Sequence, residues 1–175
     1  MQTATQPAAT RRKLYDSKAF EAQYHTDEAL GALWTPAATR FALWAPTARQ
    51  VSLSLYAEGT GGGPLLTVDL ARGGRGVWEA VVEGDLDGRY YDFAVTDCEG
   101  VTRRTADPWA RACGRDGARS MVIDLRRTDP AGWAEDAPPA RGPEDIIWEV
   151  HVKDFSHDAR SGVPAALRGK FKALT

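Results

Sequence analysis

The stretch RQVSLSLYAEG, residues 49–59, has the clearest periodicity in the chain. Apolar and polar side chains alternate along it, which is the pattern of a β-strand with one face against a core and the other towards solvent. The glycine-rich stretch GTGGGP, residues 59–64, follows it and has the composition of a flexible loop. This part of the sequence therefore predicts a half-buried strand and a loop. The inward face would carry Val51, Leu53 and Leu55, and the outward face Ser52, Ser54 and Tyr56.

Short stretches of strand character recur on both sides of this strand. Turn signals, such as Asp87–Gly88 and Glu99–Gly100, separate them, and no helical periodicity interrupts residues 39–125. About seven short strands at turn spacings of about 8–12 residues are typical of an immunoglobulin-like β-sandwich, so we expect an all-β fold. The other stretches are TRFALWAP (39–46), LLTVDL (65–70), GVWEAVVEG (76–84), RYYDFAVT (89–96) and SMVIDL (120–125).

The flanking sequence divides the rest of the chain. Residues 1–13 are small and polar, and we expect a disordered lead there. DSKAFEAQY, residues 16–24, predicts a short helix, because Asp16 and Ser17 are good N-cap residues and an aromatic pair is spaced four apart. This helix and the sandwich would form a module over residues 14–125. Residues 126–143 hold four of the ten prolines and are expected to be a linker.

A last segment, residues 144–175, begins with the apolar run EDIIWEVHV. Such a near-continuous apolar strand, here expected over residues 145–152, suits a parallel sheet that is covered on both faces. No second apolar run follows it. We therefore expect it to be the first strand of a domain whose other strands lie beyond Thr175.

The composition excludes several classes of function. The net charge is −2 and the basic residues are scattered, which indicates neither a nucleic-acid partner nor an anionic membrane. No window approaches the roughly 18 apolar residues of a membrane span, and the first residues contain no apolar signal region, so we expect a cytoplasmic protein. Cys98 and Cys113 lack the spacing of a metal or redox motif and are expected to be reduced thiols.

No short motif predicts an active site. GTGGGP and GGRGVW (73–78) lack the lysine of a phosphate-binding loop, so both are interpreted as turns. HVKDFSHD, residues 151–158, contains two histidines and two aspartates, but on a strand His151 and Asp154 would point to opposite faces, and we expect no metal site. Ser156 and Ser161 have histidines nearby without a nucleophile elbow, so no catalytic triad is predicted.

Longer blocks of the sequence resemble type I pullulanases, in the order of that family and over residues 14–175. WAPTA (44–48) and ADPWA (106–110) are shared with isoamylase-like and branching-type enzymes, whereas the final block resembles pullulanases specifically. The blocks are residues 15–56, GVWEAVVEGDLDGRYYDFAV (76–95), ADPWARACGRDGARSMVIDL (106–125), DPAGWAED (129–136) and DIIWEVHVKDFS (145–156), followed by SGVP (161–164) and RGKFKALT (168–175).

The resemblance implies a family 48 carbohydrate-binding module over about residues 30–125, then the first strand of a truncated family 13 glycoside hydrolase (β/α)8 barrel. Such enzymes hydrolyse α-1,6-glucosidic linkages in pullulan, amylopectin-derived limit dextrins or glycogen with retention. Retention requires two carboxyl groups about 5–5.5 Å apart. None of the family's catalytic motifs occurs in this sequence, so we expect no catalytic residue and no cofactor, and an inactive chain.

Glucan binding by the module is a separate question. In family members that bind glucan, two tryptophans stack on glucose, but the matching places here read YAEGTGGG (56–63) and DCEGVT (97–102). The lysine of the family's YKF strand is Asp92, which cannot replace an ammonium group. We therefore expect the module mainly to cover its own barrel. Trp78 and Trp109 are the remaining candidates for contact with carbohydrate, although a core role is favoured for each.

Two alternatives remain open. In the first alternative, the chain is a free-standing α-glucan-binding module, and calorimetry with β-cyclodextrin or maltoheptaose would give measurable heat. In the second alternative, the chain is the N-terminal part of a branching or isoamylase-type enzyme that shares the sandwich. The sequence beyond Thr175 would distinguish this second alternative from a pullulanase.

Overall fold

The computed structural model of this chain describes residues 15–138, 140 and 142–174. The disordered lead predicted for residues 1–13 lies outside the described residues. The chain divides into two compact units, Met1–Pro130 and Ala131–Thr175. In the part of the chain that is described, no helix is long and apolar enough to cross a membrane.

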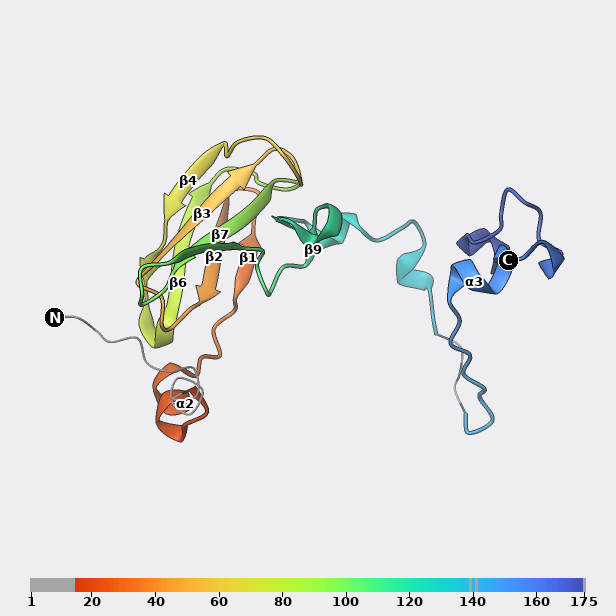
Figure 1. The fold of residues 1–175 in the computed structure, drawn as a ribbon, viewed down its shortest axis with the longest axis horizontal. Coiled ribbons are helices and arrows are strands. Elements are labelled where there is room, and N and C mark those ends of the chain that lie inside the picture. The colour runs from red at the N-terminus through yellow and green to blue at the C-terminus, as the bar shows by residue number, and fades with distance from the viewer. Residues whose placement is uncertain (1–14, 139, 141, 175) are drawn as a thin grey trace. The chain divides into compact units, whose positions relative to one another are not determined.

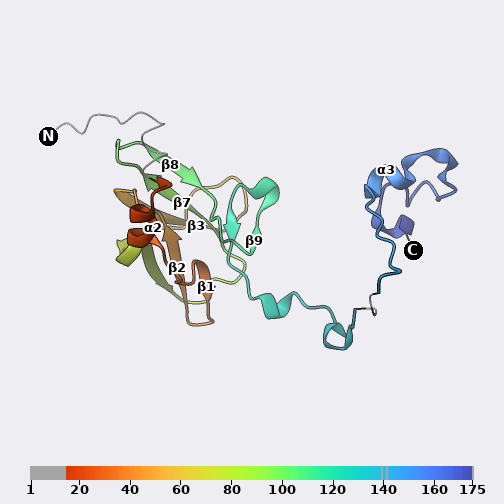
Figure 2. The same cartoon turned by 90° about the horizontal axis from the view of Figure 1, so that it is seen from below.

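The first unit is a sandwich of two antiparallel sheets (Figures 1 and 2). The strand order is β1-β2-β6-β5 in the four-stranded sheet and β4-β3-β7-β10-β9 in the six-stranded sheet, where β8 also pairs with β7. The predicted all-β, immunoglobulin-like sandwich is confirmed. The strands are β1 Gly31–Trp34, β2 Ala38–Trp44, β3 Gln50–Tyr56, β4 Leu66–Asp69, β5 Ala71–Arg72, β6 Val77–Glu83, β7 Tyr90–Thr96, β8 Thr102–Thr105, β9 Ala112–Cys113 and β10 Ser120–Met121.

The core contains the side chains that the alternation placed inward. In β3, Val51 and Leu53 are fully buried, and Leu53 lies opposite Phe93 of β7 in the antiparallel register. Across the sandwich the ring of Phe41 on β2 meets the ring of Tyr91 edge-on at 5.0 Å, and Tyr91 meets Phe93 at 5.8 Å. The Phe41–Tyr91 contact joins the two sheets, whereas Tyr91 and Phe93 both lie on β7. Edge-to-face rings at this separation attract one another beyond their burial.

The outward face of β3 differs from the prediction. Ser54 and Tyr56 are only 2% and 5% exposed, so the strand is covered on both faces instead of one. Arg104 and Arg119 of later segments lie over the Tyr56 ring, and the Ser54 hydroxyl contacts that of Thr67 on β4 at 3.2 Å. Local periodicity cannot reveal either contact.

The predicted N-terminal helix is confirmed as α2, Lys18–Tyr24. The Ser17 hydroxyl oxygen accepts a hydrogen bond from the backbone N–H of Phe20 at 3.2 Å, which satisfies one of the free donors of the first turn. The helix lies at the end of the sandwich where β2 finishes (Figure 1). There the indole N–H of Trp44 donates to the carbonyl oxygen of Tyr24 at 2.9 Å, which ties the helix to the sheet.

The strand predicted over residues 120–125 is shorter than expected. Only Ser120 and Met121 pair in β10, while Val122 fills the core and is 1% exposed. The backbone N–H of Asp124 donates to the Asp87 carboxylate at 2.9 Å, which draws the chain out of the ladder. The described 3-10 segments are Gly74–Gly76, Arg115–Gly117, Leu125–Arg127, Trp133–Glu135, Ala159–Ser161 and Phe171–Leu174.

In the second unit the strand expected over residues 145–152 is not formed, and that prediction is wrong for this structure. Residues 145–150 have no regular structure, and Val152 begins helix α3, Val152–His157. Ile146, Ile147 and Trp148 are 83%, 88% and 77% exposed. A barrel strand is held by hydrogen bonds to neighbouring strands, and residues 142–174 contain none to pair with. The barrel assignment therefore remains a proposal.

Candidate carbohydrate-binding face

The outer face of the six-stranded sheet carries an ion-paired network centred on Asp92 of β7. The Tyr56 hydroxyl donates to the Asp92 carboxylate at 3.2 Å, and the Arg104 Nε donates to it at 3.1 Å. A second Arg104 nitrogen contacts both the carboxylate and the Tyr56 oxygen. β8, which carries Arg104, lies beside β7 in the sheet (Figure 2). The acceptors of this carboxylate are thus already occupied by the chain's own donors.

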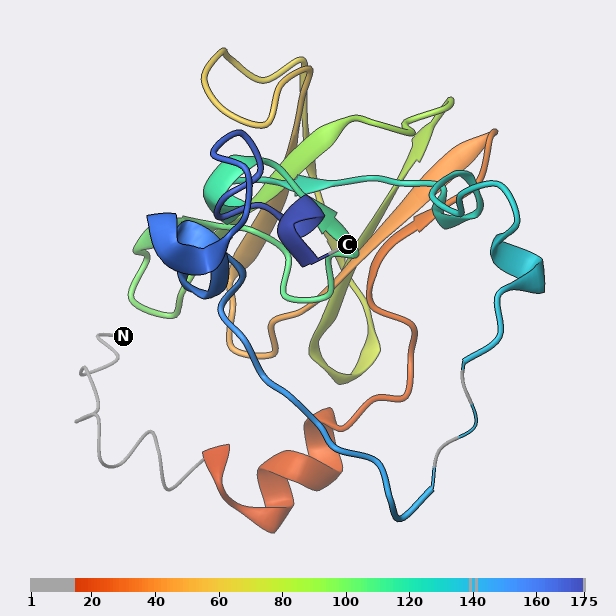
Figure 3. The same ribbon diagram turned by 90° about the vertical axis from the view of Figure 1, so that its right-hand side faces the viewer.

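Arg119 covers the ring of Tyr56. The central guanidinium carbon lies 3.4 Å from the ring centroid, a close cation–π stack. The same guanidinium donates to the carbonyl oxygens of Glu58 and Gly61, at 2.7 Å each. It therefore holds the glycine-rich loop after β3, which projects beyond the sheet in Figure 3. Arg119 thus both holds the glycine-rich loop and covers one face of the Tyr56 ring.

This arrangement closes the Tyr56 ring and the Asp92 carboxylate to a sugar. Stacking on a pyranose requires an exposed aromatic face, whereas Tyr56 is 5% exposed. Binding of sugar hydroxyls requires free donors or acceptors, and the Asp92 carboxylate is satisfied by Arg104 and Tyr56. Asp92 stands out in the sequence as a departure from the family pattern, whereas nothing in the sequence marks Arg104 and Arg119 as its neighbours. The available signal was a carboxylate in the middle of a strand, which needs a cationic partner when it is buried.

The ADPWA block forms a second polar cluster, buried at the edge of the core. Asp107 accepts hydrogen bonds from the Tyr91 hydroxyl at 2.7 Å and from the Trp109 backbone N–H at 2.8 Å. Its own backbone N–H donates to the Ser120 hydroxyl at 2.8 Å. Gly31 of β1, with φ +92°, approaches so closely that a Cβ there would lie 3.1 Å from the Trp109 carbonyl oxygen. The block therefore shapes a turn and has a structural role.

Burial controls the titration of this cluster. Asp107 is 5% exposed, and its burial raises the pKa of the carboxyl group despite the hydrogen bonds to Trp109 and Tyr91. Burial and the neighbouring Asp107 charge hold the pKa of Tyr91 well above its ordinary value. Both effects disfavour the charged form in a poorly solvated site.

Stability is expected to depend on pH through Asp107. Its folded-state pKa lies above the roughly 3.9 of a free aspartate, so the folded chain binds more protons than the unfolded chain between the two values. Asp107 should therefore lower stability progressively as the pH rises through this window. Urea unfolding of the wild type and of Asp107→Asn at pH 3–8 measures this pH dependence. As the pH rises, the free energy of unfolding of the wild type should fall relative to that of the variant. A pH-independent difference would contradict the prediction.

The structure separates the two tryptophan candidates. Trp78 lies in the core and is 5% exposed, and its indole N–H donates to the Ala45 carbonyl oxygen at 2.9 Å. Its ring face is therefore not available to a ligand. Trp109 is 43% exposed and remains a candidate for contact with carbohydrate.

The histidine-rich stretch at α3 serves as a helix cap. The ring nitrogen Nδ1 of His151 accepts a hydrogen bond from the Asp154 backbone N–H at 3.3 Å, and it lies 3.2 Å from the Asp154 carboxylate. The two side chains thus share one side, which the expectation of a strand had excluded. Within the described ranges, no group of three or more His, Cys, Asp or Glu side chains could hold a metal ion.

Comparison with known proteins connects this sandwich to glucan-processing enzymes. Residues 29–110 match the family model of carbohydrate-binding module 48, the isoamylase N-terminal domain. The chain is 32% identical to the pullulanase of Bacillus subtilis over 158 residues, which is 90% of the chain. It is also 34% identical to the 1,4-alpha-glucan branching enzyme GlgB of Jannaschia sp. over 128 residues, 70% of the chain and 18% of that enzyme.

A solved structure agrees with these matches. The pullulanase of Paenibacillus barengoltzii, in complex with maltohexaose and alpha-cyclodextrin, superposes with a TM-score of 0.80 at 35% identity and covers 91% of the chain. The chain spans 24% of that structure and 21% of the Bacillus subtilis pullulanase. Residues 29–110 are thus similar to carbohydrate-binding module 48, and the chain as a whole is similar to part of these pullulanases.

Proposed function

We propose that this chain is the N-terminal, non-catalytic part of a pullulanase-type debranching enzyme. The parent enzyme would hydrolyse α-1,6-glucosidic linkages in pullulan, limit dextrins or glycogen with retention, on a family 13 barrel. The observation that carries the proposal is the match to a pullulanase along 90% of the chain. Residues 14–125 would be the helix and sandwich module, residues 126–143 the linker and residues 144–175 the start of the barrel.

The closed outer face supports a packing role for the module. Tyr56 is covered and Asp92 is paired, so this face is poorly suited to hold glucan, and we infer that the module mainly packs on its own barrel. Glucan binding by the module would then involve other residues, Trp109 among them. The apolar side chains of residues 146–148 would be buried in the parent enzyme by neighbouring barrel strands. Exposed, unpaired Cys98 and Cys113 favour the reducing cytoplasm as its compartment.

A branching enzyme is the second candidate, because GlgB of Jannaschia sp. matches 70% of the chain at 34% identity. The pullulanase match extends over more of the chain, which favours the debranching activity. The two activities change branch points in opposite directions and are therefore separable by assay.

The test compares this chain with the natural protein that contains it, both incubated with pullulan. We expect the longer protein to release reducing ends and the 175-residue chain to release none above buffer. A longer protein that instead increases the α-1,6 branch content of amylose would identify a branching enzyme. A natural protein that ends at Thr175 and only binds glucan would overturn the enzyme assignment in favour of a free-standing module.

A further inference from the structure

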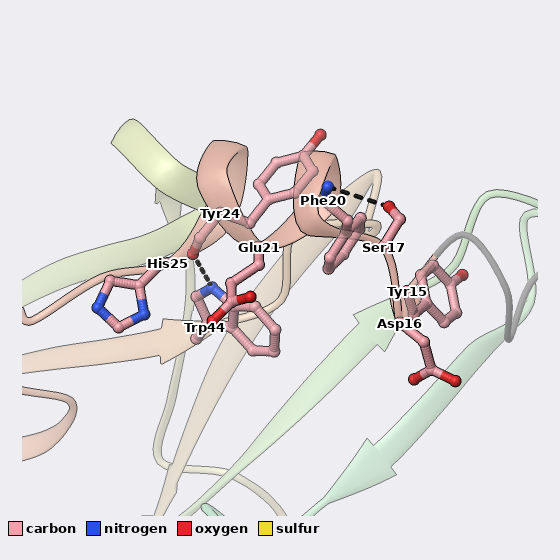
Figure 4. Close-up of a pocket in the computed structure, with 8 residues that line it drawn as sticks. All are labelled: Tyr15, Asp16, Ser17, Phe20, Glu21, Tyr24, His25 and Trp44. Atoms are coloured by element: carbon pink, nitrogen blue, oxygen red, sulfur yellow. Dashed lines mark hydrogen bonds between the residues drawn. The ribbon is translucent and has the colours of Figure 1, made fainter.

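A hollow of about 310 Å³ lies between α2 and the end of β2, and none of its described lining residues belongs to the Asp92 network (Figure 4). We call it the α2 hollow. Its wall includes four aromatic side chains and two carboxylates, and Ser17 and His25 complete the described lining. The aromatic and acidic residues are Tyr15, Phe20, Tyr24, Trp44, Asp16 and Glu21.

The aromatic wall is continuous and open to solvent. The ring centroids of Tyr15 and Phe20 are 5.2 Å apart, and those of Phe20 and Tyr24 are 4.7 Å apart. The rings are tilted by 56° and 50°, so they line the hollow instead of stacking flat on one another. Tyr15 is 41% exposed. Apolar ring surface is therefore available to a ligand that enters from solvent.

The indole of Trp44 is oriented before any ligand arrives. Its N–H donates to the Tyr24 carbonyl oxygen at 2.9 Å, and Trp44 is the last residue of β2, where it pairs with Val77 of β6. A rigid aromatic side chain contributes contact area with little loss of conformational entropy on binding. Trp44 is thus a preorganised part of the wall.

Glu21 supplies an uncommitted acceptor in the same hollow. Within the described residues, no hydrogen bond or ion pair engages its carboxylate. Figure 4 shows the side chain extending from the helix towards Trp44. A carboxylate accepts hydrogen bonds from hydroxyl groups. A ring face next to such an acceptor matches a pyranose, which has an apolar face and a rim of hydroxyls.

The charge and size of the α2 hollow narrow the class of ligand. Among the described residues that line it are two carboxylates and one histidine, His25, but no lysine or arginine, which disfavours an anionic ligand. A volume of about 310 Å³ is at the lower end of the range for small-molecule sites. A few sugar residues fit this description better than a protein surface.

We propose that the α2 hollow is a binding site for the end of an α-glucan chain. The choice of an α-glucan rests on the proposed function, because the hollow belongs to a chain related to glucan-processing enzymes. The aromatic wall would stack on glucose residues, and Glu21 would accept hydrogen bonds from their hydroxyls. The site differs from the closed outer face and from Trp109, and it depends on the helix that precedes the sandwich.

The test is calorimetric titration of the whole 175-residue chain with maltoheptaose. Tyr15→Ala is expected to weaken binding about tenfold, and Glu21→Gln about threefold, because the first removes a stacking surface and the second an ionised acceptor. Trp109→Ala tests the competing candidate for carbohydrate contact. Leu66→Ala is the matched control, since Leu66 is 43% exposed and Tyr15 41%. It should leave the affinity unchanged. Circular dichroism of each variant shows whether the fold is retained.

Three results would overturn the proposal. The first is no heat with maltoheptaose, and the second is a loss of affinity in Trp109→Ala but not in Tyr15→Ala. The third is that the chain does not bind maltoheptaose but binds a cationic probe, arginine ethyl ester, and loses this binding in Tyr15→Ala and Glu21→Gln. That result would identify a cation site. The pullulan assay of the longer protein is independent of these results, so failure of the α2 hollow and failure of the debranching assignment can be distinguished.

Discussion

Replacing Phe93 with alanine is expected to lower the free energy of unfolding by about 3–5 kcal/mol. Phe93 is fully buried in β7, lies opposite Leu53 and contacts the ring of Tyr91. Its removal would leave a cavity between two sheets, whose strands are held in register and cannot collapse freely to fill it. Chemical denaturation followed by circular dichroism measures the effect.

Leu66→Ala is the matched control for this substitution. Leu66 is 43% exposed on β4, so its truncation should have little effect on stability. A loss below about 1 kcal/mol for Phe93→Ala would show that the core relaxes around the missing ring, contrary to the packing described here.

Replacing Arg104 with alanine is expected to lower the free energy of unfolding by about 2 kcal/mol. The Asp92 side chain is 9% exposed, so without Arg104 a largely buried carboxylate retains only the Tyr56 hydroxyl as a described side-chain partner. Arg104 itself is half exposed, which keeps the effect below that of a fully buried ion pair. Chemical denaturation at low and high salt measures the loss.

Arg103→Ala is a control from the neighbouring position. Arg103 pairs with Asp97 but is 68% exposed, and such surface pairs contribute little. Adding Asp92→Asn to Arg104→Ala should recover part of the lost stability, because the unpaired charge is then removed. Equal effects of Arg103→Ala and Arg104→Ala would contradict the view that Asp92 is the charged centre of a closed face.

These predictions bear on function through the outer face. If the Asp92 network is essential for stability, this face cannot be opened for glucan without loss of structure. Any carbohydrate would then have to bind to other parts of the module. The α2 hollow offers aromatic surface and an acceptor without disturbing the core.

The sequence by itself determined the elements with strong local signals. The alternation of β3 placed Val51 and Leu53 in the core, and Ser17 set the start of α2 through its side-chain cap. Burial of an alternating strand and capping of a helix are decided by residues within a few positions of one another. For the same reason the resemblance to pullulanases, which rests on contiguous blocks, agreed with the family match.

Only the tertiary structure decided what covers each surface. Local periodicity could not show that Arg119 stacks on Tyr56 or that Arg104 neutralises Asp92, because both arginines return from later segments. Nor could it show that Trp44 and the side chains of α2 line one hollow. Residues 145–152 have the apolar content of a strand but remain unpaired, since a strand forms only where a neighbour receives its hydrogen bonds. The local pattern of side chains determines which face of an element is apolar. The positions of segments that are distant in the sequence determine which residues pack against that face.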